Sequence, residues 1–247
     1  FLVLLITASC LFHSAHHGGA AAQSDADDAP SFVIGGYLPD YRSYININAT
    51  SVHLTDLILF SLTPESILQQ YKSSSATSSC CLSSDHFGKI RSARAYKKQE
   101  HDQTIRLLVT IGGGGRSGGF ENVLGKSNTQ TQRKLFLDAL VQFCQDEEVD
   151  GIDFDHEGIQ SREEWNAYLN FLPTATSYLH RHGLLLTVAL HPQQLLPEEV
   201  CRSVDRVHVM TYDMMSSSSG DKMKHHAPLP KVKRAITEFI ENGCPPS

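Results

Sequence analysis

The chain has 247 residues, 40% of which are hydrophobic, and its formal net charge at pH 7 is -6. This is the profile of a globular protein with room for one large domain or two small ones. Because the chain is only mildly acidic and has no long run of Lys or Arg, it offers no electrostatic attraction to phosphate backbones, and nucleic-acid binding is excluded.

The first 30 residues have the pattern of a targeting segment followed by a linker. The opening run "FLVLLITASCLF" is too short to span a bilayer, and small residues and the sequence "AAAQ" follow it. We predict a secretory signal peptide at 1–22, whose start is incomplete because the chain opens on Phe1, and no membrane attachment after its removal. Residues 23–30 would form a linker and 31–247 the folded domain. The alternative is that the opening run is a buried core segment.

Cysteine usage is consistent with a secreted protein. Of the six cysteines, Cys10 would leave with the signal peptide, and an odd number would remain. At least one should therefore stay unpaired or pair outside this chain. The adjacent Cys80 and Cys81 would form a strained ring if joined to each other. Because no CxxC spacing is present and the histidines are scattered, we expect no metal site.

Six short runs rich in Val, Ile, Leu or Phe recur along the chain. They show little polar alternation, as expected for parallel strands buried on both faces. The runs are 32–38, 57–62, 105–111, 149–154, 184–190 and 204–210.

Segments with the helical spacing of apolar residues lie between these runs. In the clearest one, Phe136, Leu140 and Cys144 fall on one face. The predicted helices are 129–147, 86–100, 163–182 and 231–241. Alternating strands and helices predict an α/β fold with a parallel sheet. The Ser-rich stretch 72–85 is predicted to be a surface loop without a function of its own.

The fourth apolar run continues into "DGIDFDHEG", at 150–158. In a strand, Asp153, Asp155 and Glu157 share one face, and Ile152 and Phe154 occupy the other. Carboxylates about 7 Å apart on a partly desolvated face cannot all ionise at their normal pKa. At least one should hold a proton near neutral pH, as a general acid requires.

This stretch has three alternative interpretations. A solvated strand end does not explain the apolar partner face. A divalent metal site usually has Asn, Gly or backbone carbonyls among its ligands. Perturbed carboxylates also occur in structural networks, so the spacing alone leaves that alternative as open as acid catalysis.

The four acids of this stretch match a known signature. Asp150, Asp153, Asp155 and Glu157 reproduce the DxxDxDxE pattern of glycoside hydrolase family 18, which includes many chitinases and some endo-β-N-acetylglucosaminidases. The chain resembles this family elsewhere too, from about residue 32 to residue 242.

The other matches follow in chain order. "TIGGGG" at 110–115 resembles the SxGG signature, with Thr110 where Ser is usual. "MTYD" at 210–213 matches the MxYD pattern, and "GGYLPDY" at 35–41 and "ILFS" at 58–61 resemble the first two strand ends.

The resemblance implies a TIM (β/α)8 barrel, whose catalytic groups lie at the C-terminal ends of the strands. Only about six of eight strand-helix units can be counted before Ser247. In this family the last strand ordinarily supplies a Trp to the reacting subsite, and no residue here matches it. We therefore expect an incomplete barrel and a fragment of a longer enzyme.

The resemblance also implies substrate-assisted catalysis, in which the 2-acetamido group of the sugar is the nucleophile. Glu157 would protonate the glycosidic oxygen and later activate water, giving retention of configuration. Asp155 would hydrogen-bond the acetamido N–H, and Asp153 would share a proton with it. Tyr212 would bond the acetamido carbonyl.

Six further residues are expected at the substrate site. The two aromatic residues would flank the sugar or belong to the core, Met210 and Asp213 would shape the pocket, and the glycines would allow close backbone packing rather than chemistry. These residues are Tyr37, Phe60, Met210, Asp213, Gly112 and Gly113.

The expected protein is a secreted, monomeric endo-acting hydrolase of chitin or other β-1,4-linked N-acetylglucosamine oligosaccharides, without metal or cofactor. His156 and Gly158 stand where many chitinases carry Trp and Tyr, which keeps an endo-β-N-acetylglucosaminidase acting on N-glycans open. A non-catalytic chitin-binding lectin is the third alternative, although such proteins usually lack the catalytic acid and Glu157 is present.

Overall fold

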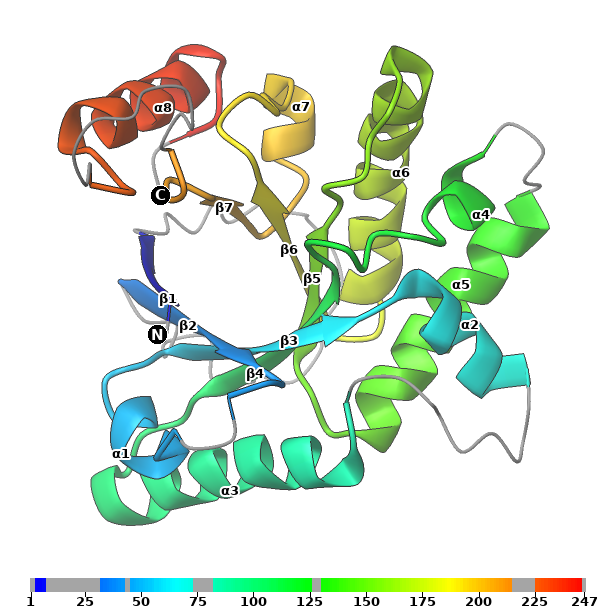
Figure 1. The fold of residues 1–247 in the computed structure, drawn as a ribbon. Helices are drawn as coiled ribbons and strands as arrows, with labels where there is room; N and C mark the ends of the chain where they lie inside the picture. Colours follow the sequence, from blue (N-terminus) through cyan, green and yellow to red (C-terminus); the bar gives the residue numbers. More distant parts are fainter. Residues whose placement is uncertain are drawn as a thin grey trace, which may run out of the picture.

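The structure is a computed structural model that describes residues 3–7, 32–42, 45–72, 82–125, 130–214 and 225–245. Six parallel strands pair in chain order. They are β2 (Val33–Pro39), β3 (Asp56–Leu62), β4 (Arg106–Gly112), β5 (Gly151–Asp155), β6 (Leu185–Leu190) and β7 (Arg206–Val209). Figure 1 shows them curving into an open half-barrel with helices on the outside. The predicted α/β fold and incomplete TIM barrel are confirmed.

The four predicted helices are present. They are α3 (Ser84–His101), α5 (Gln130–Asp146), α6 (Arg162–His180) and α8 (Leu229–Glu241). Four short helices were not predicted, because so few residues show no clear apolar period. They are α1 (Ile47–Ser51), α2 (Pro64–Lys72), α4 (Glu121–Leu124) and α7 (Glu198–Cys201).

The Ser-rich stretch 72–85 is less irregular at its ends than predicted. Lys72 is the last residue of α2, and α3 already begins at Ser84. The middle of the stretch, 73–81, lies outside the described residues.

One strand lies within the predicted signal peptide. β1 (Val3–Thr7) pairs antiparallel with β2, with Val3 opposite Tyr37 and Thr7 opposite Val33. It gives the outer edge of β2 a backbone partner, which an exposed sheet edge otherwise lacks. The signal peptide and the linker stay predictions. Within the described residues, no helix has the length and apolar character needed to cross a membrane.

The sheet separates apolar and polar side chains. Outward-facing residues such as Val109, Phe154 and Val188 are fully buried beneath the helices. Around Phe154, the rings of Phe120 and Phe171 lie with centroids 5.8 and 6.1 Å away. The outer face is therefore the main hydrophobic core, as predicted for the apolar side of β5.

The inward face is mainly polar. A small apolar cluster of Tyr37, Ile58 and Leu108 lies near the first strands. Beyond it, parallel pairing lines up one row across four strands: Thr110, Asp153, Thr187 and Arg206. Side chains in register point to the same side of the sheet, so this row faces the barrel interior.

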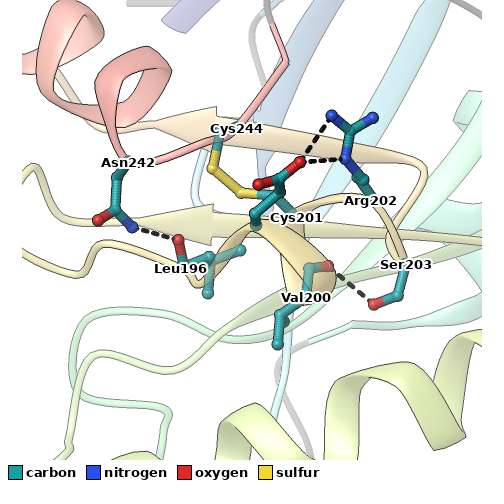
Figure 2. The surroundings of a disulfide bond; sticks show 8 residues. Leu196, Val200, Cys201, Arg202, Ser203, Asn242 and Cys244 are labelled. Atoms are coloured by element: carbon teal, nitrogen blue, oxygen red, sulfur yellow. Dashed lines mark hydrogen bonds and ion pairs between the residues drawn. A yellow bond between two sulfur atoms is a disulfide. The ribbon is translucent and has the colours of Figure 1, made fainter.

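A disulfide ties the segment after α8 to α7, the short helix between β6 and β7. Cys201, at the end of α7, bonds Cys244, just after α8. Figure 2 shows this bond beside a hydrogen bond from the Asn242 side chain to the Leu196 carbonyl, which joins the same two segments. Cys144 is buried and free, in agreement with the expectation of at least one unpaired cysteine, and burial raises the pKa of its thiol.

Candidate active site

Asp153 lies at the centre of the inward row and is fully buried. Its register neighbours are Thr110 on β4 and Thr187 on β6, and both hydroxyls donate to it, at 3.1 Å to Oδ2 and 2.6 Å to Oδ1. Tyr37 donates to Oδ2 at 2.9 Å, and Nδ1 of His208 lies 3.3 Å from Oδ1. Each carboxylate oxygen therefore has two partners.

These partners determine the charge of Asp153. Burial alone would raise its pKa, but the hydrogen bonds from His208, Thr187 and Tyr37 outweigh burial and hold the pKa below the ordinary value. Asp153 is thus ionised near neutral pH. Burial and the charge of Asp153 raise the pKa of Tyr37, so its phenol keeps its hydrogen and donates it.

Asp155 is two residues further along β5 and has different neighbours. In register with it are Gly112 on β4 and Ala189 on β6, which have no polar side chain to offer. Its Oδ1 is buried and has no hydrogen-bond partner. Burial, followed by the charges of Glu157 and Asp153, raises the pKa of Asp155 to about 8. The predicted carboxyl that holds a proton near neutral pH is therefore Asp155.

Two glycines bring the end of β4 close to the backbone of Asp155, as the predicted close packing requires. A Cβ on Gly112 would stand 2.1 Å from the Asp155 carbonyl oxygen, and Gly113 N–H donates to that oxygen at 2.7 Å. A Cβ on Gly113 would meet the ring of Phe60 at 2.2 Å. Both glycines have positive φ, 105° and 97°, which other residues rarely adopt.

Glu157 lies just beyond the end of β5, at the mouth of the half-barrel. Its backbone N–H donates to Oγ of Ser117 at 3.0 Å, and Ser117 in turn donates to the Asp155 carbonyl at 3.1 Å. The side chain is 27% exposed, and its Oε2 lies 3.2 Å from Nε2 of His191. Of the three predicted acids, Glu157 is therefore the one open to solvent.

Asp150, the first acid of the pattern, is at the opposite end of the strand. Its Oδ2 accepts a hydrogen bond from Leu107 N–H at 2.7 Å and pairs with Arg94 of α3. Burial raises its pKa in spite of these partners. Asp150 thus anchors the start of β5 and is separate from the other three acids.

The MxYD residues follow β7. Met210 is buried and its N–H donates to the Leu190 carbonyl at 2.8 Å. Tyr212 is half-buried, and burial and the charges of Asp155 and Glu157 raise its pKa, so it stays a neutral hydrogen-bond donor. Asp213 is 84% exposed and turns toward His226, 3.2 Å away, rather than toward the acids.

The two predicted aromatic residues have different surroundings. Tyr37 is buried, and its hydroxyl contacts Asp153 and, at 2.7 Å, Nδ1 of His208. Phe60 is half-buried beside Tyr37, and the Arg116 guanidinium lies 5.9 Å from its ring centre. Phe60 thus keeps an accessible ring, whereas Tyr37 belongs to the polar row.

His156 is turned away from the acids. It is buried on the helix side, stacked on Phe120 with ring centroids 4.4 Å apart, and its Nε2 is 3.2 Å from Glu164. Burial lowers its pKa, so it is neutral near pH 7. Its identity therefore says nothing about sugar contacts, and the N-glycan alternative loses that argument. A Cβ on Gly158 would stand 3.4 Å from Cβ of Ser117.

Four contributors were missed from the sequence: Thr187, His208, Ser117 and His191. Thr187 is the one polar residue of β6, and His208 alternates with valines in β7, which also carries Arg206. Both lie at positions that alternate onto the inward face, and that placement was a usable signal. The contacts of Ser117 and His191 join loops that are distant along the chain, and no local pattern reports them.

Among the described residues, no group of three or more His, Cys, Asp or Glu side chains has the arrangement of a metal site. The side chains that the site brings together carry carboxyl, phenol and imidazole groups. On the inward face of β5 and just beyond its end, the ionised Asp153, the protonated Asp155 and the solvent-accessible Glu157 follow one another.

This fold and site define a barrel-type enzyme scaffold with its acids at the C-terminal ends of parallel strands. The sequence profile of glycosyl hydrolases family 18 matches residues 34–247, and the chain belongs to that family. The predicted resemblance is confirmed. A comparison with curated protein sequences returned no match.

Solved structures with the same fold include plant chitinases and a related agglutinin. A class V chitinase from Nicotiana tobaccum superposes with a TM-score of 0.66 at 20% identity, covering 85% of this chain and 63% of the other. A class V chitinase mutant from Cycas revoluta in complex with (GlcNAc)3 gives 0.67 at 18%, covering 86% and 65%. The chitinase-like agglutinin from Robinia pseudoacacia gives 0.64 at 22%, covering 85% and 66%. The chain thus spans slightly less than two thirds of the length of these structures.

Proposed function

We propose that this protein is a retaining glycoside hydrolase that cleaves β-1,4-linked N-acetylglucosamine polymers, chitin and its oligosaccharides, by substrate-assisted catalysis. The observation that carries the proposal is the arrangement of three acids with different properties on the inward side of β5 and just beyond its end. Asp153 is ionised, Asp155 is protonated near neutral pH, and Glu157 is open to solvent. Family membership and the neighbour that binds (GlcNAc)3 support the substrate class.

In this mechanism Glu157 gives its proton to the glycosidic oxygen. The carbonyl oxygen of the sugar's 2-acetamido group attacks the anomeric carbon, and the leaving group departs. The carboxylate of Glu157 then takes a proton from water, which opens the oxazolinium ring and restores the original configuration.

Asp155 orients the acetamido group. Its unpartnered Oδ1 accepts the acetamido N–H, which satisfies a buried acceptor that the protein itself leaves free. The fixed charge of Asp153 contributes to the raised pKa of Asp155, so the two acids form a coupled unit. Tyr212, kept neutral by burial and nearby charge, donates to the acetamido carbonyl.

We also propose that the protein is exported. A disulfide such as Cys201–Cys244 persists in oxidising compartments and is rare in the cytosol. The short apolar run at the start of the chain supports the same conclusion.

A second candidate is a chitin-binding lectin on the same scaffold, which the likeness to the Robinia agglutinin favours. Proton NMR of chitotetraose incubated with the full-length protein separates the two. Early appearance of β-anomeric product is expected for the hydrolase. Early α-anomer would contradict the retaining mechanism, and saturable binding without any hydrolysis would favour the lectin. A high-mannose glycopeptide assayed in parallel tests the N-glycan alternative.

A further inference from the structure

Glu157 has a side-chain partner outside every motif that led to the site. His191 directly follows the last residue of β6, and its Nε2 lies 3.2 Å from Oε2 of the Glu157 carboxyl. Both side chains are partly exposed at the mouth of the half-barrel, His191 at 46%. The imidazole therefore meets the acid on the solvent side of the site.

The position of His191 is coupled to the backbone of the acid. The backbone N–H of His191 donates to Oε1 of Gln194 at 2.7 Å. In turn, Nε2 of Gln194 donates to the backbone carbonyl of His156 at 3.2 Å. That carbonyl is the one directly before Glu157. One amide side chain thus fixes both the histidine and the peptide that carries the acid.

Ser117 holds the same peptide from the other side. Its hydroxyl oxygen accepts the N–H of Glu157 at 3.0 Å. With the backbone held on both sides, the remaining freedom of Glu157 is in its side-chain torsions. The contact between His191 and the Glu157 carboxyl limits those torsions.

The two carboxyl oxygens of Glu157 are therefore not equivalent. They differ in their contact with His191, which lies 3.2 Å from Oε2. Both oxygens lie beside Gly114, 3.7 and 3.9 Å from where a Cβ would stand, so no side chain of that residue crowds Oε1. We propose that His191 is a positioning residue for the catalytic acid, holding Oε2 so that Oε1 donates the proton. This inference rests on the proposed function above.

The proton balance of this step is simple. In the resting state Oε1 carries the transferable hydrogen and Nε2–H of His191 donates to Oε2. Transfer of the Oε1 hydrogen to the glycosidic oxygen leaves a carboxylate that keeps the bond from His191. A hydrogen from the attacking water later returns to Oε1, and His191 neither gains nor loses a proton.

The expected effect is on rate rather than on folding. A partly exposed contact between a histidine and a carboxyl group contributes only about 0 to 1 kcal/mol to stability. Misplacement of a catalytic group by about 1 Å can lower the rate by about 100-fold. His191→Ala should therefore fold normally and lower kcat on chitotetraose by about 10- to 100-fold, with little change in KM.

The test compares two leaving groups in the full-length protein. The 4-nitrophenyl glycoside of diacetylchitobiose releases a phenolate that needs no protonation, so its kcat should change less than about 3-fold in His191→Ala. His191→Gln, whose amide can donate to Oε2, should recover most of the chitotetraose rate. His53→Ala, which alters an exposed histidine before β3, is the matched control and should behave as wild type.

The outcomes separate the two proposals. Equal losses on both substrates, or no loss on chitotetraose, would overturn the role of His191 while wild-type hydrolysis upholds the proposed function. Failure of His191→Gln to recover any rate would also count against the positioning role. If the wild-type protein hydrolyses neither substrate, the proposed function fails and the inference fails with it.

Discussion

Both ends of the half-barrel bury acids, and they do so in different ways. At the N-terminal ends of the strands, Asp56 of β3 is fully buried and pairs with Arg106 and Arg206, at 3.0 and 3.1 Å. At the C-terminal ends, Asp153 is held by hydroxyl groups and an imidazole, and Asp155 has an oxygen without a partner. Arginine neutralises the first set, whereas neighbouring acids perturb the second.

This difference separates acids that stabilise the fold from acids that can take part in a reaction. A buried carboxylate paired with arginine is inert, and its removal leaves unpaired cations in the interior. A carboxyl with a raised pKa and a free oxygen can exchange a proton or accept a ligand. Strand β5 shows a related contrast, with the partly exposed Asp150 paired with Arg94 at its start and the unpaired Asp155 at its end. This matches the division of barrel enzymes into a structural face and a reactive face.

The largest effect is expected at the arginine-paired end. Asp56→Ala would leave the buried guanidinium of Arg206 without its carboxylate, and burial already lowers the pKa of Arg206. The free energy of unfolding should fall by about 3 to 5 kcal/mol, measured by urea titration. The kcat of the remaining folded protein should be unchanged. A loss below about 1 kcal/mol would show that this cluster does not stabilise the fold.

The disulfide should come next. Cys201→Ser opens a bond between residues separated by 43 positions. The expected destabilisation is about 2 to 4 kcal/mol, with kcat unchanged because the acids lie on other strands. Treating wild type with a reductant should lower the melting temperature in the same way. A variant as stable as wild type would mean that the bond contributes nothing beyond the hydrogen bonds around it.

A matched pair on β5 tests the comparison most sharply. Asp155→Asn should lower kcat on chitotetraose by about 100-fold, equivalent to about 2.7 kcal/mol, because the amide, unlike the carboxyl, cannot release its proton to become a negative charge beside the oxazolinium ring. Asp150→Asn should leave kcat within about 3-fold of wild type and reduce stability instead, since its partners are Arg94 and Leu107 N–H. Equal effects of the two variants on kcat would contradict the division into a structural end and a reactive end.

The smallest predicted effect is a pH-dependent change in stability. Because the folded-state pKa of Asp155 is about 8 and the ordinary value is 3.8, the folded protein retains a proton that the unfolded chain releases between those values. The contribution of protonated Asp155 to the free energy of unfolding is complete below about pH 4 and is lost as pH rises through about 8. Asp155→Asn should therefore gain about 1 to 2 kcal/mol relative to wild type between pH 4 and pH 5.5, at about 1.4 kcal/mol per pH unit. A constant difference across this range would contradict the raised pKa.

Much of the fold was predictable because hydrophobic burial dominates each strand. The apolar run 149–154 predicted β5, and the alternation within it placed Phe154 toward the helices and Asp153 inward. The short helix α7 was missed, since its boundaries depend on turns around Pro197 rather than on an apolar period. The antiparallel pairing of Val3–Thr7 was also missed, because a terminal apolar run does not reveal a backbone partner.

The site was predictable in composition and less so in electrostatics. The motif identified the acids, but the raised pKa of Asp155 depends on Gly112 and Ala189 standing beside it in the sheet. The hydrogen bonds that satisfy the Asp153 carboxylate likewise depend on Thr187 and His208 from later strands. The pairing between strands decides these contacts, and that pairing cannot be predicted from the sequence of one strand.

The most direct test of the account is the kcat of Glu157→Gln on chitotetraose, measured with the full-length protein beside its binding constant for the same sugar. The amide keeps the size of the side chain but cannot donate the proton, so kcat should fall by about 100- to 10,000-fold while binding is retained. A variant that hydrolyses chitotetraose at the wild-type rate would contradict the assignment of Glu157 as the acid.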